Sequence, residues 1–218
     1  MAAGGALGDC EGHIVRRVVL AMRNGHKVRE LRVILADLIA ELDLEIVGMG
    51  EFPDVPDVVE TGVTFAQNAT LKAVAAARAT GLPALADDSG LAVNVLGGAP
   101  GVFSARWAGT HGQDRANLEI LLGQLSDVPD EQRSAAFVCV AALALPGGTV
   151  LLRRGRMPGM LAREPRGDNG FGYDPILVVD GDSRTAAELT FEEKNAISHR
   201  GKAFRALAPD LREVFAAD

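Results

Sequence analysis

The stretch Leu82–Gly101 constrains the fold more than any other part of the sequence. Its apolar run, Leu82–Ala86, predicts a short buried strand, because turn residues flank it on both sides. Two carboxylates, a hydroxyl and a glycine follow at once, in the order Asp87-Asp88-Ser89-Gly90. Ligands of open α/β sheets bind at the carboxyl ends of the strands. We therefore expect a binding site immediately after residue 86.

The acidic pair Asp87-Asp88 has two open interpretations. Adjacent buried carboxylates are costly to desolvate unless a cation neutralises them, and a divalent metal ion is the usual partner. Alternatively, an Asp-Ser-Gly turn forms here and its side chains cap their own backbone. The stretch alone does not favour either interpretation, so the rest of the chain has to separate them.

The composition excludes several classes of protein. A chain of 218 residues can bury one substantial core, in a large single domain or a two-lobed one. The net charge of -7 argues against a protein that coats DNA or RNA, although a nucleotide substrate needs only a local cluster of cations. No apolar run approaches the roughly 18 residues that cross a bilayer, so we expect no membrane partner.

The first residues and the cysteines predict where the protein works. Met1–His13 is small and acidic rather than basic and then apolar, which predicts a flexible tail and no signal peptide. We expect a single two-lobed domain over residues 14–218. The cysteines, Cys10 and Cys139, have no CxxC spacing, which argues against a disulfide scaffold or a zinc site. These features predict a protein of the reducing cytoplasm.

A strand, a polar turn and a helix open the domain. Arg17–Ala21 predicts a strand, and a stripe of apolar residues from Val28 to Leu38 predicts a helix. The turn between them carries Asn24 and Lys27. Backbone N–H groups at a helix start can hold phosphate, with Lys27 as a point charge. An ordinary strand-to-helix turn is the alternative, because the Walker A pattern is absent.

A second polar cluster precedes the acidic stretch. Leu44–Val47 predicts a strand, and a loop rich in proline and acids then leads to Glu60. Thr64 and Gln67 form a capping box for a helix from Phe65 to about Thr80. Asn68 and Lys72 lie four residues apart and so share one face of that helix. A solvated surface lysine is the alternative for Lys72.

The second half of the chain predicts further helices and strands and one glycine-rich loop. Gly167–Pro175 holds several glycines, which let backbone approach a flat ligand, and Phe171, which offers a face for stacking. The remaining predicted elements are a helix over 114–125, a central strand over 133–145 with a hairpin partner over 149–156, a strand over 176–179, a capped helix from Thr190 to Ile197, and a last helix over 203–215.

The chain resembles the family of inosine/xanthosine triphosphate pyrophosphatases, enzymes that remove damaged nucleotides from the nucleotide pool. The resemblance implies an α/β fold, with a two-lobed α/β/α arrangement on a central mixed sheet, and a homodimer. It runs from about Val18 to Leu211 and rests on the following blocks, which occur in the family's order: 21–27, 60–62, 64–65, 68–69, 71–73, 86–90, 97–106, 170–175, 187–189 and 197–201.

The resemblance also assigns roles within the site. Asp88 falls on the proton acceptor and, with Glu60, on the ligands of a Mg²⁺ cofactor. Lys72 falls on a catalytic cation that stabilises the transition state. The triphosphate contacts fall on Asn24, Lys27, Lys72 and Ser89. The base contacts fall on Phe171, Gly172, Tyr173, Asp174, Lys194, His199 and Arg200.

Three positions depart from the family pattern. Met22 stands where Ser or Thr is usual, so one hydroxyl contact to phosphate is missing. Gln67 replaces a frequent Glu but keeps the capping box. Asn94 replaces a usual Asp, which we expect to lower the charge near the metal. None of the three is a residue assigned to the chemistry.

The resemblance predicts hydrolysis of ITP, dITP and XTP to the monophosphate and pyrophosphate. The donors of His199 and Arg200 suit the 6-oxo group of hypoxanthine and xanthine, whereas adenine would leave them facing its amino group. Two alternatives stay open. The chain could bind and sense nucleotides without turnover, or it could be a phosphatase that releases orthophosphate.

Overall fold

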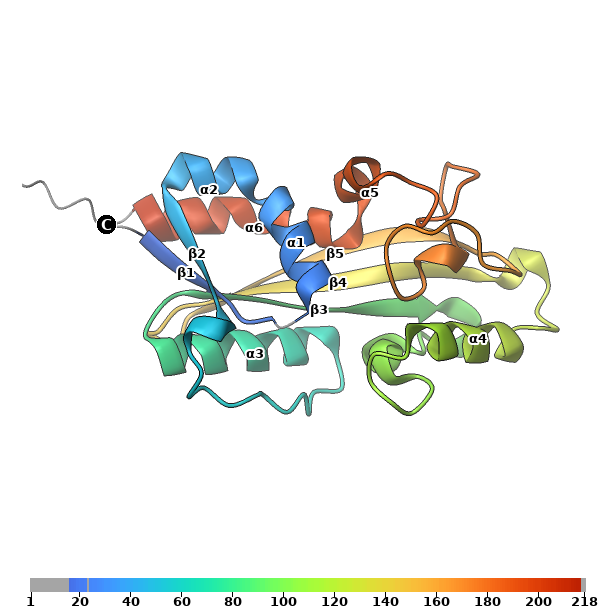
Figure 1. The fold of residues 1–218 in the computed structure, drawn as a ribbon, viewed down its shortest axis with the longest axis horizontal. Coiled ribbons are helices and arrows are strands. Elements are labelled where there is room, and N and C mark those ends of the chain that lie inside the picture. The colour runs from blue at the N-terminus through green and yellow to red at the C-terminus, as the bar shows by residue number, and fades with distance from the viewer. Residues whose placement is uncertain (1–15, 23, 217–218) are drawn as a thin grey trace, which may run out of the picture.

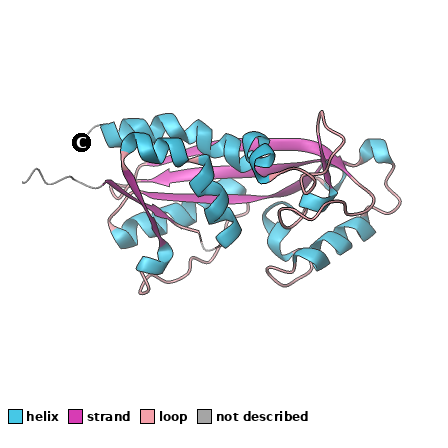
Figure 2. Ribbon diagram, turned by 45° about the horizontal axis from the view of Figure 1, so that its top comes forward, coloured by secondary structure: helices cyan, strands magenta, loops and turns pink. Residues whose placement is uncertain are grey.

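A computed structural model describes residues 16–22 and 24–216 and shows one six-stranded sheet between layers of helices (Figures 1 and 2). The predicted tail, Met1–His13, and Cys10 lie outside the described residues. The strands are β1 (Arg16–Leu20), β2 (Leu44–Gly48), β3 (Ala84–Val93), β4 (Ser134–Ala144), β5 (Val150–Leu161) and β6 (Leu177–Val179). The α-helices are α1 (Gly25–Ile34), α2 (Ala36–Leu42), α3 (Phe65–Thr80), α4 (Asp114–Gln124), α5 (Phe191–Ile197) and α6 (His199–Ala216).

The sheet is mixed, as predicted. Its strand order is β2-β1-β3-β4-β5-β6. Strand β1 runs parallel to β2 and β3, whereas β3, β4, β5 and β6 pair in antiparallel fashion. Helices α1, α2 and α6 lie on one side of the sheet and α3 lies on the other (Figure 1). The chain therefore has the α/β architecture that the sequence predicts.

The core divides along the length of the sheet, which produces the two lobes. In the lobe that contains β1 and β2, one cluster packs α1, α2 and α6 on the sheet. A second cluster in the same lobe packs the alanine-rich face of α3 on the opposite side. The third cluster lies around the far parts of β3, β4 and β5 and includes α4 (Figure 1). The strands β3, β4 and β5 connect the two lobes.

The central strand differs from its prediction. The apolar run was expected to stop before Asp87, but β3 continues through the acids to Val93. The cause is pairing with a distant strand, because β4 is antiparallel to β3 over its whole length, with Asp87 opposite Ala141 and Asp88 opposite Val140. The other edge of β3 pairs with β1 only as far as Leu85. The acids therefore lie just beyond the carboxyl end of β1, in the middle of β3.

Two predicted helices also have different bounds. The first divides at Leu35, which ends α1 and starts α2. The last helix begins at His199, four residues before the predicted start, and Ser198 Oγ accepts the N–H of Gly201 at 2.9 Å in its first turn. Other predictions agree with the structure. The predicted helix 65–80 is α3, the predicted helix 114–125 is α4, and the predicted strand 44–47 is β2. Both predicted capping boxes, Thr64–Gln67 and Thr190–Glu193, are present.

Two broader predictions can also be compared with the described residues. Among them, no helix is both long enough and apolar enough to cross a bilayer. The thiol of Cys139 is free and buried in β4.

Candidate active site

A cleft of about 590 Å³ lies beyond the carboxyl end of β1 and brings residues from both lobes together. Every site residue predicted from the sequence lines it: Asn24, Lys27, Glu60, Lys72, Asp88, Ser89, Phe171, Gly172, Tyr173, Asp174, Lys194, His199 and Arg200. Their roles toward a substrate stay predictions. The walls also include residues that sequence reasoning did not select, among them Arg106, His111 and Asp114 from the other lobe.

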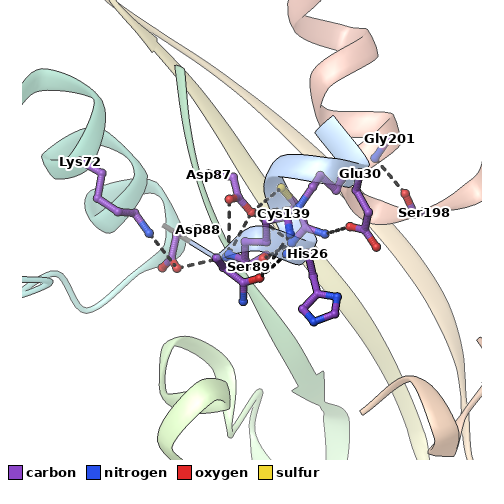
Figure 3. A network of polar contacts seen from close by, with 12 residues as sticks. His26, Glu30, Lys72, Asp87, Asp88, Ser89, Cys139, Ser198 and Gly201 are labelled. Atoms are coloured by element: carbon purple, nitrogen blue, oxygen red, sulfur yellow. Dashed lines mark hydrogen bonds and ion pairs between the residues drawn. The ribbon is translucent and has the colours of Figure 1, made fainter. Parts of the chain in front are cut away.

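Asp88 and Asp87 point to opposite faces of the sheet because successive side chains of a strand alternate. Asp88 lies on the side of α3 and of Lys72, whereas Asp87 lies on the side of Glu30 and Cys139 (Figure 3). The adjacent carboxylates therefore belong to two different networks. The opposite orientation of the two side chains argues against one metal ion held by both, which was one of the two open interpretations of the pair.

The Asp88 network connects α3 with the loop before it. Asn68 Nδ2 donates to Asp88 Oδ2 at 3.1 Å, and Lys72 Nζ lies 3.6 Å from Asp88 Oδ1. Lys72 Nζ also donates to Glu60 Oε1 at 2.9 Å. Burial raises the pKa of Asp88, although the nearby ammonium of Lys72 opposes the rise. A carboxylate with a raised pKa is a better proton acceptor.

Lys72 is not a solvated surface lysine. Its side chain is 15% exposed and contacts two carboxylates. Burial disfavours the ammonium, but the charges of Asp87 and Asp88 outweigh burial and raise the pKa of Lys72. Lys72 therefore remains a cation in the cleft, which is the form that can stabilise developing negative charge.

Asp87 belongs to a buried chain of alternating charges. Its carboxylate contacts Lys27 Nζ at 3.2 Å and Arg200 Nη2 at 3.3 Å. Although burial opposes ionisation, Lys27 and Arg200 hold the pKa of Asp87 well below its usual range. The cation that neutralises Asp87 is thus supplied by protein side chains.

The same chain of charges continues to the glycine-rich loop. Arg200 pairs with Glu30, Glu30 Oε1 accepts from Lys194 Nζ at 3.2 Å, and Lys194 donates to Asp174 Oδ2 at 2.7 Å. Burial raises the pKa of Asp174, and the charge of Lys194 opposes the rise. Glu30 is 5% exposed and was not predicted. Its only sequence signal is its position one turn after Lys27 on the same helix.

The predicted base contacts are largely engaged with other protein groups. Arg200 Nη2 donates to Ser89 Oγ at 2.9 Å as well as to Asp87. Tyr173 Oη donates to the carbonyl of Ser104 at 2.9 Å. The N–H of Gly172 donates to Asp114 Oδ2 at 2.9 Å. These hydrogen bonds connect the glycine-rich loop to Ser104 and Asp114.

His199 lines the cleft and has one buried polar atom without a partner. Its ring stacks on Phe137 with centroids 5.0 Å apart, and its Nδ1 is buried without a hydrogen-bond partner in the described structure. Burial, together with the charges of Arg200 and Lys194, lowers the pKa of His199 well below its usual value. The imidazole is therefore neutral and can bind a ligand through one ring nitrogen.

The ring of Phe171 lines the cleft and contacts two side chains. The ring of His26 stacks on it with centroids 5.4 Å apart, and Lys194 Nζ lies 5.1 Å from its centroid. His26 was not predicted, since its partner lies far away in the sequence.

Asn24 caps α1, because its Oδ1 accepts the N–H groups of His26 at 2.9 Å and of Lys27 at 3.3 Å.

The three departures from the family pattern have different positions. Met22 lines the cleft but is buried in the core of the β1 lobe. Gln67 keeps the capping box, as expected. Asn94 does not line the cleft, and its Nδ2 donates to Ser134 Oγ at 2.8 Å. The expectation that Asn94 lowers the charge near a metal is therefore wrong, because β3 carries it away from Asp88.

Glu60 and Asp88 are the carboxylates predicted to hold a metal ion, and both line the cleft. Both contact the same ammonium, Lys72 Nζ, so they face the same small volume. In the described parts of the chain, no cluster of three or more His, Cys, Asp or Glu could hold a metal. Mg²⁺ usually binds through one or two carboxylates together with substrate phosphates and water. A pair of carboxylates in a nucleotide-sized cleft fits that requirement.

Comparison with known proteins agrees with the fold. A model of the Ham1 family matches residues 18–210. The chain is 63% identical over 198 residues to a dITP/XTP pyrophosphatase of Streptomyces avermitilis, which covers 91% of this chain and 98% of that protein.

The structure is also similar to solved structures of Ham1 proteins and of a dITP/XTP pyrophosphatase. A HAM1 protein from Coxiella burnetii has a TM-score of 0.82 at 48% identity, over 91% of this chain and all of that chain. A nucleoside-triphosphatase / dITP/XTP pyrophosphatase from Mycobacterium abscessus has a TM-score of 0.74 at 51% identity, over 88% of this chain and 99% of that chain. The family match spans most of the sequence, and the chain belongs to the Ham1 family.

Proposed function

We propose that this protein hydrolyses dITP, XTP and ITP to the nucleoside monophosphate and pyrophosphate, and so removes deaminated purines from the nucleotide pool. Relatives that carry the name dITP/XTP pyrophosphatase cover nearly the whole chain at up to 63% identity. The observation that carries the proposal is one cleft that is lined by the buried carboxylate of Asp88, by Lys27 and Lys72, and by the aromatic ring of Phe171. These groups suit a water, a polyphosphate and a purine base.

Asp88 is the proposed proton acceptor for the attacking water. Its raised pKa and its position between Asn68 and Lys72 support this role. The water's proton moves to a carboxylate oxygen of Asp88, and the water's oxygen bonds to the α-phosphorus. The bond from that phosphorus to the oxygen that bridges the α and β phosphates breaks, and pyrophosphate leaves. We assign Lys72 and Lys27 to the phosphates, where their charges stabilise the transition state.

Mg²⁺ is the proposed cofactor, held by Glu60 and Asp88. When bound, the ion neutralises phosphate charge and orients the reacting groups. Asp87 plays no part in holding it, since Lys27 and Arg200 already neutralise that carboxylate. Asn24 and Ser89 complete the proposed phosphate contacts at the α1 start and on β3.

Base selection is proposed for the side of the cleft around Phe171. The neutral His199, with its unpartnered Nδ1, and Lys194 can meet the 6-oxo group, while Phe171 supplies a stacking face. We also assign the backbone of Gly172, Tyr173 and Asp174 to this subsite. Arg200 contributes through any N–H that its contacts with Glu30, Asp87 and Ser89 leave free.

The assembly and the location are further parts of the proposal. We propose a cytoplasmic homodimer that binds neither DNA nor RNA and no membrane. The net charge of -7 supports the absence of a nucleic-acid partner. Light scattering coupled to size exclusion measures the assembly, and a monomer at micromolar concentration would contradict the dimer.

A steady-state pyrophosphate assay tests the proposed function. We expect turnover of dITP, XTP and ITP, and much lower kcat/KM for ATP and GTP, because a site built to bond the 6-oxo group rejects a mismatched base. Nucleotide binding without pyrophosphate release would instead favour the sensing alternative. Equal kcat/KM for all five nucleotides would contradict the proposed base selection.

A further inference from the structure

We propose that Asn68 is a positioning residue, which orients the carboxylate of Asp88 and ties it to the loop that carries Glu60. The inference rests on the proposed function and adds a residue outside the predicted site. The side-chain amide of Asn68 is buried between a donor, the N–H of Gly62, and an acceptor, the carboxylate of Asp88. Asn68 is 1% exposed and lies in the first turn of α3.

The contacts of Asn68 connect the two parts of the site. Its Oδ1 accepts the backbone N–H of Gly62 at 2.8 Å, and its Nδ2 donates to Asp88 Oδ2 at 3.1 Å. The N–H of Gly62 can only donate, and an ionised carboxylate can only accept. The amide therefore has one orientation that satisfies both neighbours. A leucine of similar size satisfies neither, so the requirement is for an amide and not only for volume.

Asn68 closes a ring around the volume proposed for the metal and phosphate. Gly62 follows Glu60 by two residues, Asn68 joins Gly62 to Asp88, and Lys72 joins Asp88 back to Glu60. Glu60 and Asp88 are thus held relative to each other by two separate bridges. The Lys72 bridge is an ammonium that we assign to phosphate. Asn68 is the bridge that stays in place when Lys72 turns to the substrate.

The two carboxylate oxygens of Asp88 have different hydrogen-bond donors, and Asn68 is a donor to one of them. The N–H of Ser89 donates to Asp88 Oδ1 at 3.1 Å, on the same oxygen that faces Lys72. The donor to Oδ2 in the described structure is Asn68. Without that donor the carboxylate can rotate about its last side-chain bond. Rotation moves the lone pairs away from the water that the carboxylate has to deprotonate.

Gly62 is part of the same arrangement because a residue with a side chain does not fit at this position. A Cβ on Gly62 would lie 2.6 Å from Asn68 Oδ1 and 2.6 Å from Gln67 Cβ, both closer than van der Waals contact. The backbone can therefore approach the buried amide only at a glycine. Gly62→Ala should displace Asn68 and so reproduce part of the effect of removing its amide.

The test compares Asn68→Leu with Gln67→Leu. Gln67 Oε1 accepts the N–H groups of Val63 at 2.7 Å and Thr64 at 3.2 Å, at the same helix start but without contact to Asp88. Loss of a residue that orients a ligand or base typically costs about 10- to 100-fold in activity. We expect that loss in kcat on dITP for Asn68→Leu and not for Gln67→Leu.

Binding and stability are measured on the same proteins. The Kd for a non-hydrolysable α,β-methylene analogue of dITP, measured by calorimetry, should stay close to wild type in both variants. The Tm should fall in both, because each loses hydrogen bonds to the loop. A merely structural role would lower the Tm of Asn68→Leu and leave its kcat unchanged, and would overturn the proposal.

A second pair of variants keeps the test decisive if Asn68→Leu does not fold. Gly62→Ala should lower kcat, and Gly62→Ala with Asn68→Ala should cost no more than the worse single variant, because both act through one bridge. Additive losses, or an unchanged kcat for Gly62→Ala, would overturn the positioning role. A wild-type protein that releases no pyrophosphate from dITP would contradict the proposed function itself.

Discussion

At the level of single residues, the alternation of side chains along a strand explains why Asp87 and Asp88 differ. Because neighbours on β3 face opposite sides of the sheet, Asp87 and Asp88 have the same chemistry but different environments. Asp87 is fully paired with cations and stays ionised. Asp88 has a raised pKa and lines the cleft beside Lys72 and Asn68. Only the second environment suits proton transfer, and substitutions at the two positions should therefore differ in kind.

Asp88→Asn should abolish proton acceptance and leave binding in place. The loss of a general base lowers kcat by about 100-fold or more. We expect KM for dITP to change little, since the amide keeps the shape of the side chain. Steady-state pyrophosphate release measures both constants. A variant that turns over at near wild-type rate would show that another group accepts the proton.

Asp87→Asn should act on stability instead. It removes the charge between Lys27 and Arg200 and leaves a buried guanidinium with one carboxylate partner, Glu30. Breaking a buried ion pair on one side typically costs about 3 kcal/mol or more. Denaturant unfolding measures the change in the free energy of unfolding.

The matched control for Asp87→Asn is Glu41→Gln. That carboxylate pairs with Arg212 on the surface, where both side chains are nearly half exposed, and exposed pairs contribute little. We expect its free energy of unfolding to stay near the wild-type value. Equal losses in the two variants would contradict the buried charge chain as a source of stability.

At the scale of elements, the contact of α6 with β5 positions His199 and Arg200. The helix begins at His199, so both residues lie in its first turn, directly over the sheet. Gly155 on β5 allows this approach, because a Cβ there would overlap the backbone of His199 and Ala203. Both overlaps are with backbone, which cannot rotate away as a side chain can.

Gly155→Ala should therefore displace the start of α6 and lower stability and activity together. The helix has to shift for the methyl group to fit, and that shift moves Arg200 away from Asp87. Thermal unfolding and kcat/KM for dITP measure the two effects. Gly147→Ala is the matched control, since nothing lies within 4 Å of its added Cβ. Similar Tm values for the two variants would contradict the close-packing argument.

Local signals predicted some elements well and missed those set by distant contacts. The capping boxes of α3 and α5 depend on residues three apart, and both occur as predicted. The length of β3 depends on pairing with β4, so Asp87 and Asp88 resembled a turn. Glu30 and His26 were missed because their partners lie far along the chain, 170 residues away for Arg200 and Glu30. The predicted site residues were found through the resemblance, since each motif alone was weak.

At the scale of the whole molecule, the cleft lies where the two lobes meet. The β1 lobe supplies Lys27, Lys72 and Asp88, and the glycine-rich loop beside the other lobe supplies Phe171. The buried chain of charges runs between them through Glu30 and fixes their relative position. A nucleotide in the cleft would thus contact one rigid unit at both its phosphates and its base.

Metal dependence is a prediction that concerns the whole cleft. Two carboxylates, Glu60 and Asp88, face a polyanionic substrate, and we propose that Mg²⁺ makes that encounter favourable. We expect no turnover in excess EDTA and recovery on adding Mg²⁺, with Ca²⁺ a poor substitute because its looser geometry misplaces the water. Pyrophosphate release across a metal titration measures this. Full turnover under exhaustive chelation would contradict the metal role.

The central claim is that this cleft cleaves a deaminated purine triphosphate between its α and β phosphates. Phosphorus NMR of dITP incubated with the protein and Mg²⁺ identifies the products directly. We predict resonances of dIMP and pyrophosphate in equal amounts, with dATP left intact under the same conditions. The appearance of dIDP and orthophosphate, or equal consumption of dATP, would contradict the claim.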